Sequence, residues 1–279
     1  MMINVSLGIA LSVIAFFCEY VDSTLGMGYG TALTPILMLF GFTPMQIVPV
    51  VLLSELLSGL LAGFFHHKNG NVNFKPTTTN LSIVVSELKS AGLLKSFKKI
   101  IPIHLKVALL LGICSIAGSV LAVFIAINIP KFWLKLYIGF LVLVMGIIVL
   151  VCLNKEFKFS WQKIVFLGAI ATFNKGMSGG GYGHVVTGGQ ILSGIEGKSA
   201  IGITSLAEGL TYPVGLITYA IFAKNPLYWK LAPWIISGAI LSVPLSAISV
   251  KKIKTNKLIL AIALLTIVLG SGTIIRILI

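Results

Sequence analysis

Charged residues are scarce in this chain of 279 residues. Asp, Glu, Lys and Arg together make up 10% of the sequence and hydrophobic residues 57%, whereas a soluble domain has about 25% charged residues. The mean hydropathy is +1.04. A water-soluble globular fold is therefore excluded, and the composition predicts an all-α integral membrane protein.

Acidic residues are rarer still, with seven of them against 21 lysines and arginines, which gives a net charge of +14. In a soluble protein this excess would favour nucleic-acid binding. Here the lysines gather between apolar runs, as they do in the cytoplasmic loops of membrane proteins. We therefore expect the chain to contact a lipid bilayer and no nucleic acid.

Cysteine is also sparse. Cys18, Cys114 and Cys152 all lie inside apolar runs without metal-ligand spacing, which excludes a disulfide framework and a zinc site. We expect no cofactor and no metal. The N-terminal segment lacks the basic region and the cleavage site of a signal peptide, so we expect it to remain as a membrane segment.

Apolar segments fill most of the chain. Six exceed about 19 residues and can each cross the hydrocarbon core, namely 45–66, 104–127, 132–153, 198–222, 231–250 and 257–279. The first segment, 3–21, is also long enough but runs into Asp22 and a glycine cluster. Three others are too short and flank glycine clusters: 31–41, 161–173 and 184–195. Such short pieces are typical of broken or re-entrant helices.

The sequence contains an internal repeat. A shift of 153 residues places residues 26–55 over residues 179–208 without a gap. Identical pairs include Gly26/Gly179, Gly28/Gly181, Tyr29/Tyr182, Gly30/Gly183, Thr34/Thr187, Gly41/Gly194, Leu53/Leu206 and Glu55/Glu208. Because acidic residues are so rare here, the match of two glutamates favours a true duplication.

Each half then reads as a broken or re-entrant hairpin followed by three membrane-spanning helices. An odd number of crossings places the second half upside down, which is the plan of two inverted-topology repeats. We expect the first repeat at 1–153, with a cytoplasmic loop at 67–103, and the second at 154–279, in one membrane domain. Regions expected in the cytoplasm hold 14 lysines and the opposite side four, which agrees with the positive-inside rule.

The two glycine clusters form the first candidate site. Irregular backbone survives at membrane depth only where protein or a water-filled cavity satisfies it, and a helix that begins there directs N–H groups toward a ligand. Half-helices starting near Thr31 and His184 would therefore favour an anion, whereas close helix packing is the alternative. The candidate substrate-binding residues are Gly26, Gly28, Tyr29, Gly30, Thr31, Asn174, Lys175, Ser178, Gly179, Gly180, Gly181, Tyr182, Gly183 and His184.

Glu55 and Glu208 form the second candidate site, for proton coupling. Each lies about ten residues into a long span, where a charged carboxylate costs on the order of 2.5 to 3.5 kcal/mol. A carboxyl at this depth can take up and release a proton as access alternates. The structural alternative is a protonated or hydrogen-bonded glutamate that joins helices, and both roles remain open.

Lys175 is predicted deep in the membrane, in the second glycine turn. A buried cation beside a helix N-terminus would select anions, whereas a lysine that reaches the interface from the mouth of the hairpin is the alternative. Its counterpart in the first half is Asp22, so the site would be asymmetric. The remaining histidines border the long loop and are expected at the membrane interface: His66, His67 and His104.

Two stretches resemble a known family. CEYVDSTLGMGYGTALTPILMLFGFTP and FNKGMSGGGYGHVVTGGQILSGIEGKSA each read as a glycine-rich turn, an apolar helix and a short turn, similar to the TauE/SafE sulfite-exporter family, also called toluene sulfonate uptake permeases. The resemblance implies a multi-pass permease of a bacterial-type plasma (inner) membrane. Its implied substrates are small sulfur-containing anions such as sulfite, thiosulfate or organosulfonates. Since no nucleotide site is visible, we expect an ion gradient to drive transport, and we expect that gradient to be one of protons.

Two other functions stay open at this point. A cation-coupled or cation-carrying transporter would bind its ion with Glu55, Glu208, Glu19 and Asp22. An intramembrane enzyme would be built around Ser178 and His184. We expect a transporter with alternating access and no enzyme, because inverted repeats suit alternating access.

Overall fold

The computed structural model describes residues 4–42, 44–76, 78, 100–114, 131–151, 158–178, 182–222 and 227–278. Within these ranges every regular element is a helix, as predicted. The helices are α1 (Val5–Leu25), α2 (Tyr29–Leu39), α3 (Pro44–Lys68), α6 (Lys131–Val151), α7 (Trp161–Ser178), α8 (Tyr182–Leu192), α9 (Gly197–Phe222), α10 (Ala232–Lys252) and α11 (Thr255–Leu278). A further helix is described over Ile103–Cys114.

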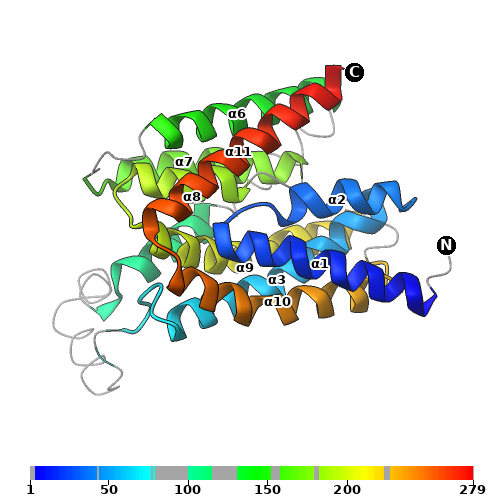
Figure 1. The fold of residues 1–279 in the computed structure, drawn as a ribbon, viewed down its shortest axis with the longest axis horizontal. Coiled ribbons are helices and arrows are strands. Elements are labelled where there is room, and N and C mark those ends of the chain that lie inside the picture. The colour runs from blue at the N-terminus through cyan, green and yellow to red at the C-terminus, as the bar shows by residue number, and fades with distance from the viewer. Residues whose placement is uncertain are drawn as a thin grey trace.

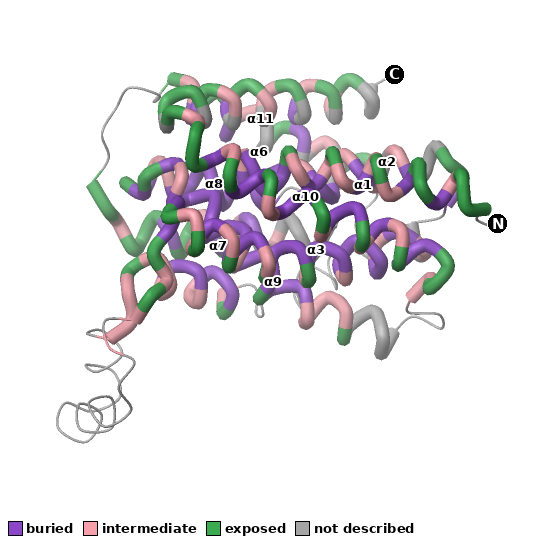
Figure 2. Tube along the Cα trace, turned by 60° about the horizontal axis from the view of Figure 1, so that its bottom comes forward, coloured by how far each residue is buried: buried purple, intermediate pink, exposed green. Residues whose placement is uncertain are grey.

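The surface of the molecule is suited to lipid. In the part of the chain that the structure describes, four helices are long and apolar enough to cross a membrane, in α1, α3, α9 and α10. Large apolar side chains are exposed along the helices, for example Phe17 at 61%, Phe166 at 67% and Leu241 at 67%. Figure 2 shows the buried residues concentrated in the middle of the molecule. Exposed apolar surface of this kind marks a membrane protein.

The two short helices α2 and α8 have 11 residues each, as the sequence predicted for short segments. They begin 153 residues apart, at Tyr29 and Tyr182, and a turn with a left-handed glycine follows each. Gly41 has φ 89° and Gly194 has φ 87°, a conformation that suits only glycine. The two aligned stretches of sequence thus form helices with equivalent bounds, and an equivalent glycine turn follows each helix.

Helix α7 ends later than the sequence suggested. The prediction placed Asn174, Lys175 and Ser178 in a glycine turn after an apolar segment at 161–173, whereas α7 runs on to Ser178. Asn and Lys do not break a helix, and the single Gly176 costs only about 1 kcal/mol. The half-helices α2 and α8 begin at Tyr29 and Tyr182, two residues before the starts predicted near Thr31 and His184.

Three pairs of helices pack along each other: α3 with α9, α1 with α10, and α6 with α11. In Figure 1 α6 lies along the upper edge of the molecule, and α11 starts near the end of α10 and crosses the view of α7 and α8 to reach that edge. Glycine makes the α3–α9 contact possible. A Cβ atom on Gly59 would lie 2.8 Å from the Ser205 carbonyl oxygen, and one on Gly209 would lie 2.8 Å from the Leu60 nitrogen. The two backbones therefore touch, as in other small-residue contacts between membrane helices.

The apolar core contains helices from both the first and the second half of the chain. In one cluster Leu11 and Ala15 of α1 share a core with Ile235 of α10. In the other, Ile164 of α7 shares a core with Leu111 of the helix Ile103–Cys114. Each of α1 and α7 therefore packs against a helix from the other part of the sequence.

The α3–α9 contact generates a stability prediction. Gly59→Val forces β-branched atoms into the α9 backbone, and we expect it to destabilise the protein by about 1–3 kcal/mol or more. Gly272→Val is the matched control, because a Cβ atom there meets nothing within 4 Å. Thermal unfolding of both variants in detergent measures the effect. Equal transition temperatures would contradict the close packing.

Candidate functional site

The turn between α1 and α2 lies inside the protein. Gly26 caps α1 with φ 74°, and its N–H donates to the Asp22 carbonyl. Gly28 has φ 123°, so both positions need glycine. Met27 and Tyr29 are fully buried. The first interruption of helical backbone is therefore surrounded by protein.

Protein groups satisfy part of this buried backbone. The Tyr29 N–H, at the start of α2, donates to Asp22 Oδ1 at 3.0 Å. The Thr187 hydroxyl of α8 donates to the Gly26 carbonyl oxygen at 2.8 Å. Asp22 thus serves as a side-chain cap for α2. In this conformation the Tyr29 amide is therefore not available to an anion.

The start of α8 lies directly against this turn. A Cβ atom on Gly183 would be 2.9 Å from Met27 Cα and closer still to the Gly26 carbonyl oxygen. The structure therefore brings Gly26 and Gly183 together. Gly179, Gly180 and Gly181 lie outside the described residues, as do the side chains of Thr31, Asn174, Lys175, Ser178 and His184. Ligand binding by all of these residues stays a prediction.

Four carboxyl groups are buried near this meeting point. Glu19 and Asp22 come from α1, Glu55 from α3 and Glu208 from α9, and each is at most 6% exposed. Glu19 interacts electrostatically with Asp22 and Glu55, and the buried Tyr212 side chain interacts with Glu208, Glu55 and Asp22. Four of the seven acidic residues therefore gather in one buried cluster, which we call the carboxyl cluster.

Hydroxyl groups line the carboxyl cluster. Ser23 donates to Glu19 Oε1 at 2.6 Å, and the Tyr212 hydroxyl bonds with the Glu55 carboxyl. Among the described residues Glu19 Oε2 has no hydrogen-bond partner. A buried charge is costly unless it is paired, so this environment disfavours a permanent negative charge on the carboxyl.

A chain of hydrogen bonds joins α8 and α9 to the first turn. Gln190 Nε2 donates to Thr204 Oγ1 at 2.8 Å, Thr204 and Thr187 hydroxyls are 2.9 Å apart, and Thr187 donates to Gly26. Because the first donor is an amide and the last acceptor a carbonyl, the direction of every bond is fixed. The internal repeat matches Thr187 with Thr34 but does not indicate this role.

His66, which the sequence places at the membrane interface, is buried inside the protein. Its side chain is fully buried, with Nε2 2.9 Å from the Ser23 carbonyl oxygen and Nδ1 3.0 Å from Asn71 Nδ2. The chain reverses at Gly70, which has φ 79°, and so returns Asn71 to His66. The Asn-Gly pair before Asn71 was the local signal for this turn.

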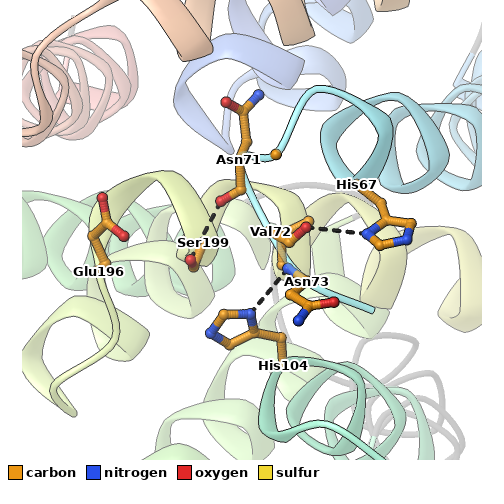
Figure 3. A pocket seen from close by; sticks show the side chains of 8 residues that line it. His67, Asn71, Val72, Asn73, His104, Glu196 and Ser199 are labelled. Carbon is orange, nitrogen blue, oxygen red and sulfur yellow. Dashed lines mark hydrogen bonds between the residues drawn. The ribbon is translucent and has the colours of Figure 1, made fainter. Parts of the chain in front are cut away.

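A pocket of about 430 Å³ opens where this turn meets the end of the α8–α9 connection. Figure 3 shows its polar lining, in which His104 Nδ1 accepts the Asn73 N–H at 3.2 Å. The lining residues are His67, Gly70, Asn71, Val72, Asn73, His104, Glu196 and Ser199. Sequence reasoning missed the pocket, because these residues come from three separate segments.

Comparison with known proteins decides the family. The model of the family described as Sulfite exporter TauE/SafE matches residues 11–85 and 76–273. The chain belongs to this family. YtnM of Bacillus subtilis (strain 168), described as a probable membrane transporter protein, is 26% identical over 258 residues, 88% of this chain and 75% of that protein. No solved structure matches the chain.

Membership in the TauE/SafE family confirms the resemblance predicted from the two glycine-rich stretches. The family indicates a multi-pass membrane transporter of small anions such as sulfite, in keeping with a protein that is not an enzyme. The apolar surface and the candidate spans agree with this conclusion.

The cap on α2 gives a prediction that separates charge from hydrogen bonding. Asp22→Ala removes the acceptor for the Tyr29 amide, and we expect a loss of about 1 kcal/mol of stability. Asp22→Asn keeps an oxygen acceptor and should retain most of that stability. Thermal unfolding in detergent compares the two. If Asn destabilises as much as Ala, the negative charge and not the cap is what stabilises the turn.

Proposed function

We propose that this protein is a secondary transporter that moves small sulfur-containing anions, such as sulfite, thiosulfate or organosulfonates, across the plasma (inner) membrane together with protons. The TauE/SafE family supports the substrate class. The carboxyl cluster supports the coupling, and it is the observation that carries the proposal: Glu19, Asp22, Glu55 and Glu208 are all buried around the meeting point of the turn and α8.

Simple electrostatics links the anion to the proton. Two like charges about 4 Å apart repel by about 4 kcal/mol at an effective dielectric constant of 20, so an anion binds poorly beside a carboxylate. Protonation removes the repulsion. By linkage, the bound anion raises the affinity for the proton by the same factor. Glu55 and Glu208 are the proposed coupling residues, and Glu19 joins them because it interacts with Glu55.

The anion is assigned to the start of α8. On the first turn, Asp22 already occupies the Tyr29 amide. The residue that aligns with Asp22 is Lys175, in the last turn of α7, so the second half has a positive charge where the first has a negative one. A helix N-terminus beside a cation attracts anions. Asn174, Ser178 and the glycines that precede Tyr182 would add donors.

The packing supports two inverted repeats with alternating access. Counterpart helices contact each other, α3 with α9 and α6 with α11, as expected beside a twofold axis. The hairpin helices α1 and α7 each pack against the other half. A binding site between such halves is opened to either side by rocking one half against the other.

Coupling to a metal cation is the second candidate. The same four carboxyls favour it, because carboxylate oxygens also bind hard metal cations. The two mechanisms differ in the gradient that they use. Cation coupling predicts anion accumulation driven by a Na⁺ or K⁺ gradient at equal pH on both sides. Proton coupling predicts none under those conditions.

Flux measurement in proteoliposomes tests the proposal. Radiolabelled thiosulfate is the preferred probe, because it remains a dianion near neutral pH and any pH effect then comes from the protein. With the membrane potential clamped to zero, one pH unit supplies about 1.4 kcal/mol per proton, which drives about tenfold accumulation. Empty liposomes are the control. Uptake that ignores the pH gradient would contradict proton coupling.

The coupling residues make a further prediction. Glu55→Gln and Glu208→Gln should each abolish the pH-driven accumulation while leaving thiosulfate binding largely intact, since glutamine cannot take up a proton. Glu196→Gln is the matched control, because Glu196 is an exposed acid outside the cluster. Unchanged pH dependence in both cluster variants would remove the coupling role.

A further inference from the structure

We propose that His66 and Asn71 form a gate that separates the carboxyl cluster from the pocket at the end of α3. The role of this gate in transport rests on the proposed function, but its existence is tested without any substrate. The observations that support the gate are the hydrogen bonds, the burial and the position of these two residues.

The bonds of His66 fix its chemical state. The Ser23 carbonyl can only accept, so His66 Nε2 carries the proton and donates at 2.9 Å. The Asn71 amide nitrogen can only donate, so His66 Nδ1 accepts at 3.0 Å. The imidazole is therefore neutral and both of its nitrogens are occupied. His66 links the end of α3 to α1.

Asn71 extends this link to two further helices. Its side-chain nitrogen donates to the Ala247 carbonyl of α10 at 2.7 Å, and its backbone oxygen accepts from Ser199 of α9 at 3.3 Å. Its own N–H returns to the His66 carbonyl at 3.0 Å. Helices α1 and α3 belong to the first half of the chain, and α9 and α10 belong to the second. The pair therefore joins the two halves.

The pair also lies between two polar regions. On one side Asn71 and Ser199 line the pocket of about 430 Å³, as Figure 3 shows. On the other side His66 binds Ser23, whose hydroxyl donates to Glu19 Oε1 at 2.6 Å. His66 is fully buried and Asn71 is 4% exposed. Movement of one half against the other would break these bonds and open the carboxyl cluster to the pocket.

A cysteine placed beside Glu19 reports whether this gate is open. Ser58 is buried next to Glu19, so Ser58→Cys is introduced after replacing Cys18, Cys114 and Cys152 by alanine. A membrane-impermeant maleimide is added to vesicles from the pocket side or from the opposite side. The measured quantity is the labelling rate from each side.

Asn71→Ala should accelerate labelling from the pocket side by about tenfold, because loss of a buried hydrogen-bond partner shifts the closed–open equilibrium by that order. Asn69→Ala is the matched control. Its side chain bonds only locally, to the Phe65 carbonyl at 2.9 Å, and labelling should keep the parental rate. Ser199→Ala removes only the α9 bond and should give a smaller acceleration from the same side.

Labelling from the opposite side separates a gate from general loosening. A gate predicts no acceleration there in Asn71→Ala. Equal acceleration from both sides, or parental rates from the pocket side in both Asn71→Ala and Ser199→Ala, would overturn the proposal. If Asn71→Ala accelerates labelling from the pocket side but the protein transports no sulfur anion, the gate is supported and the proposed substrate is refuted.

Discussion

A backbone polar group that leaves the regular helix at membrane depth must find a partner inside the protein, because hydrocarbon offers none. The turn between α1 and α2 obeys this constraint through Asp22, which accepts the Tyr29 amide, and Thr187, which donates to Gly26. These bonds place a carboxyl from α1 and a hydroxyl from α8 at the same turn. The broken helix and the gathering of polar side chains around it thus have one cause.

The carboxyl cluster follows from the same arrangement. Close contact at Gly59 and Gly209 lets α3 and α9 cross backbone to backbone, while α1 ends in the glycine turn. These helices carry Glu55, Glu208 and Glu19 into one buried region. Burial raises the free energy of an ionised carboxyl there. A transported anion would raise it further unless the carboxyls are protonated. In the proposed function, proton coupling is an electrostatic consequence of this burial.

Sequence reasoning recovered the elements whose signals are local. The short helices α2 and α8 follow from apolar length and flanking glycine, and Glu55 and Glu208 follow from acids in apolar spans. It placed the end of α7 too early, because the polar residues Asn174 and Lys175 beside glycines are typical of a turn but are also compatible with a helix. It did not predict the burial of His66 or the pocket. The partners of His66 and Asn71, namely Ser23, Ala247 and Ser199, are distant in sequence, and only tertiary packing brings them together.

Proton uptake on anion binding tests the central claim most directly. Purified protein in weakly buffered detergent solution is mixed with thiosulfate at saturating concentration, and a pH indicator records protons taken up while calorimetry records binding. Linkage between anion and carboxyl requires proton uptake, which approaches about one proton per bound anion at a pH above the midpoint of the coupling group in the free protein and below its midpoint in the anion-bound protein. Binding with no proton uptake across the pH range, or with proton release, would contradict the account.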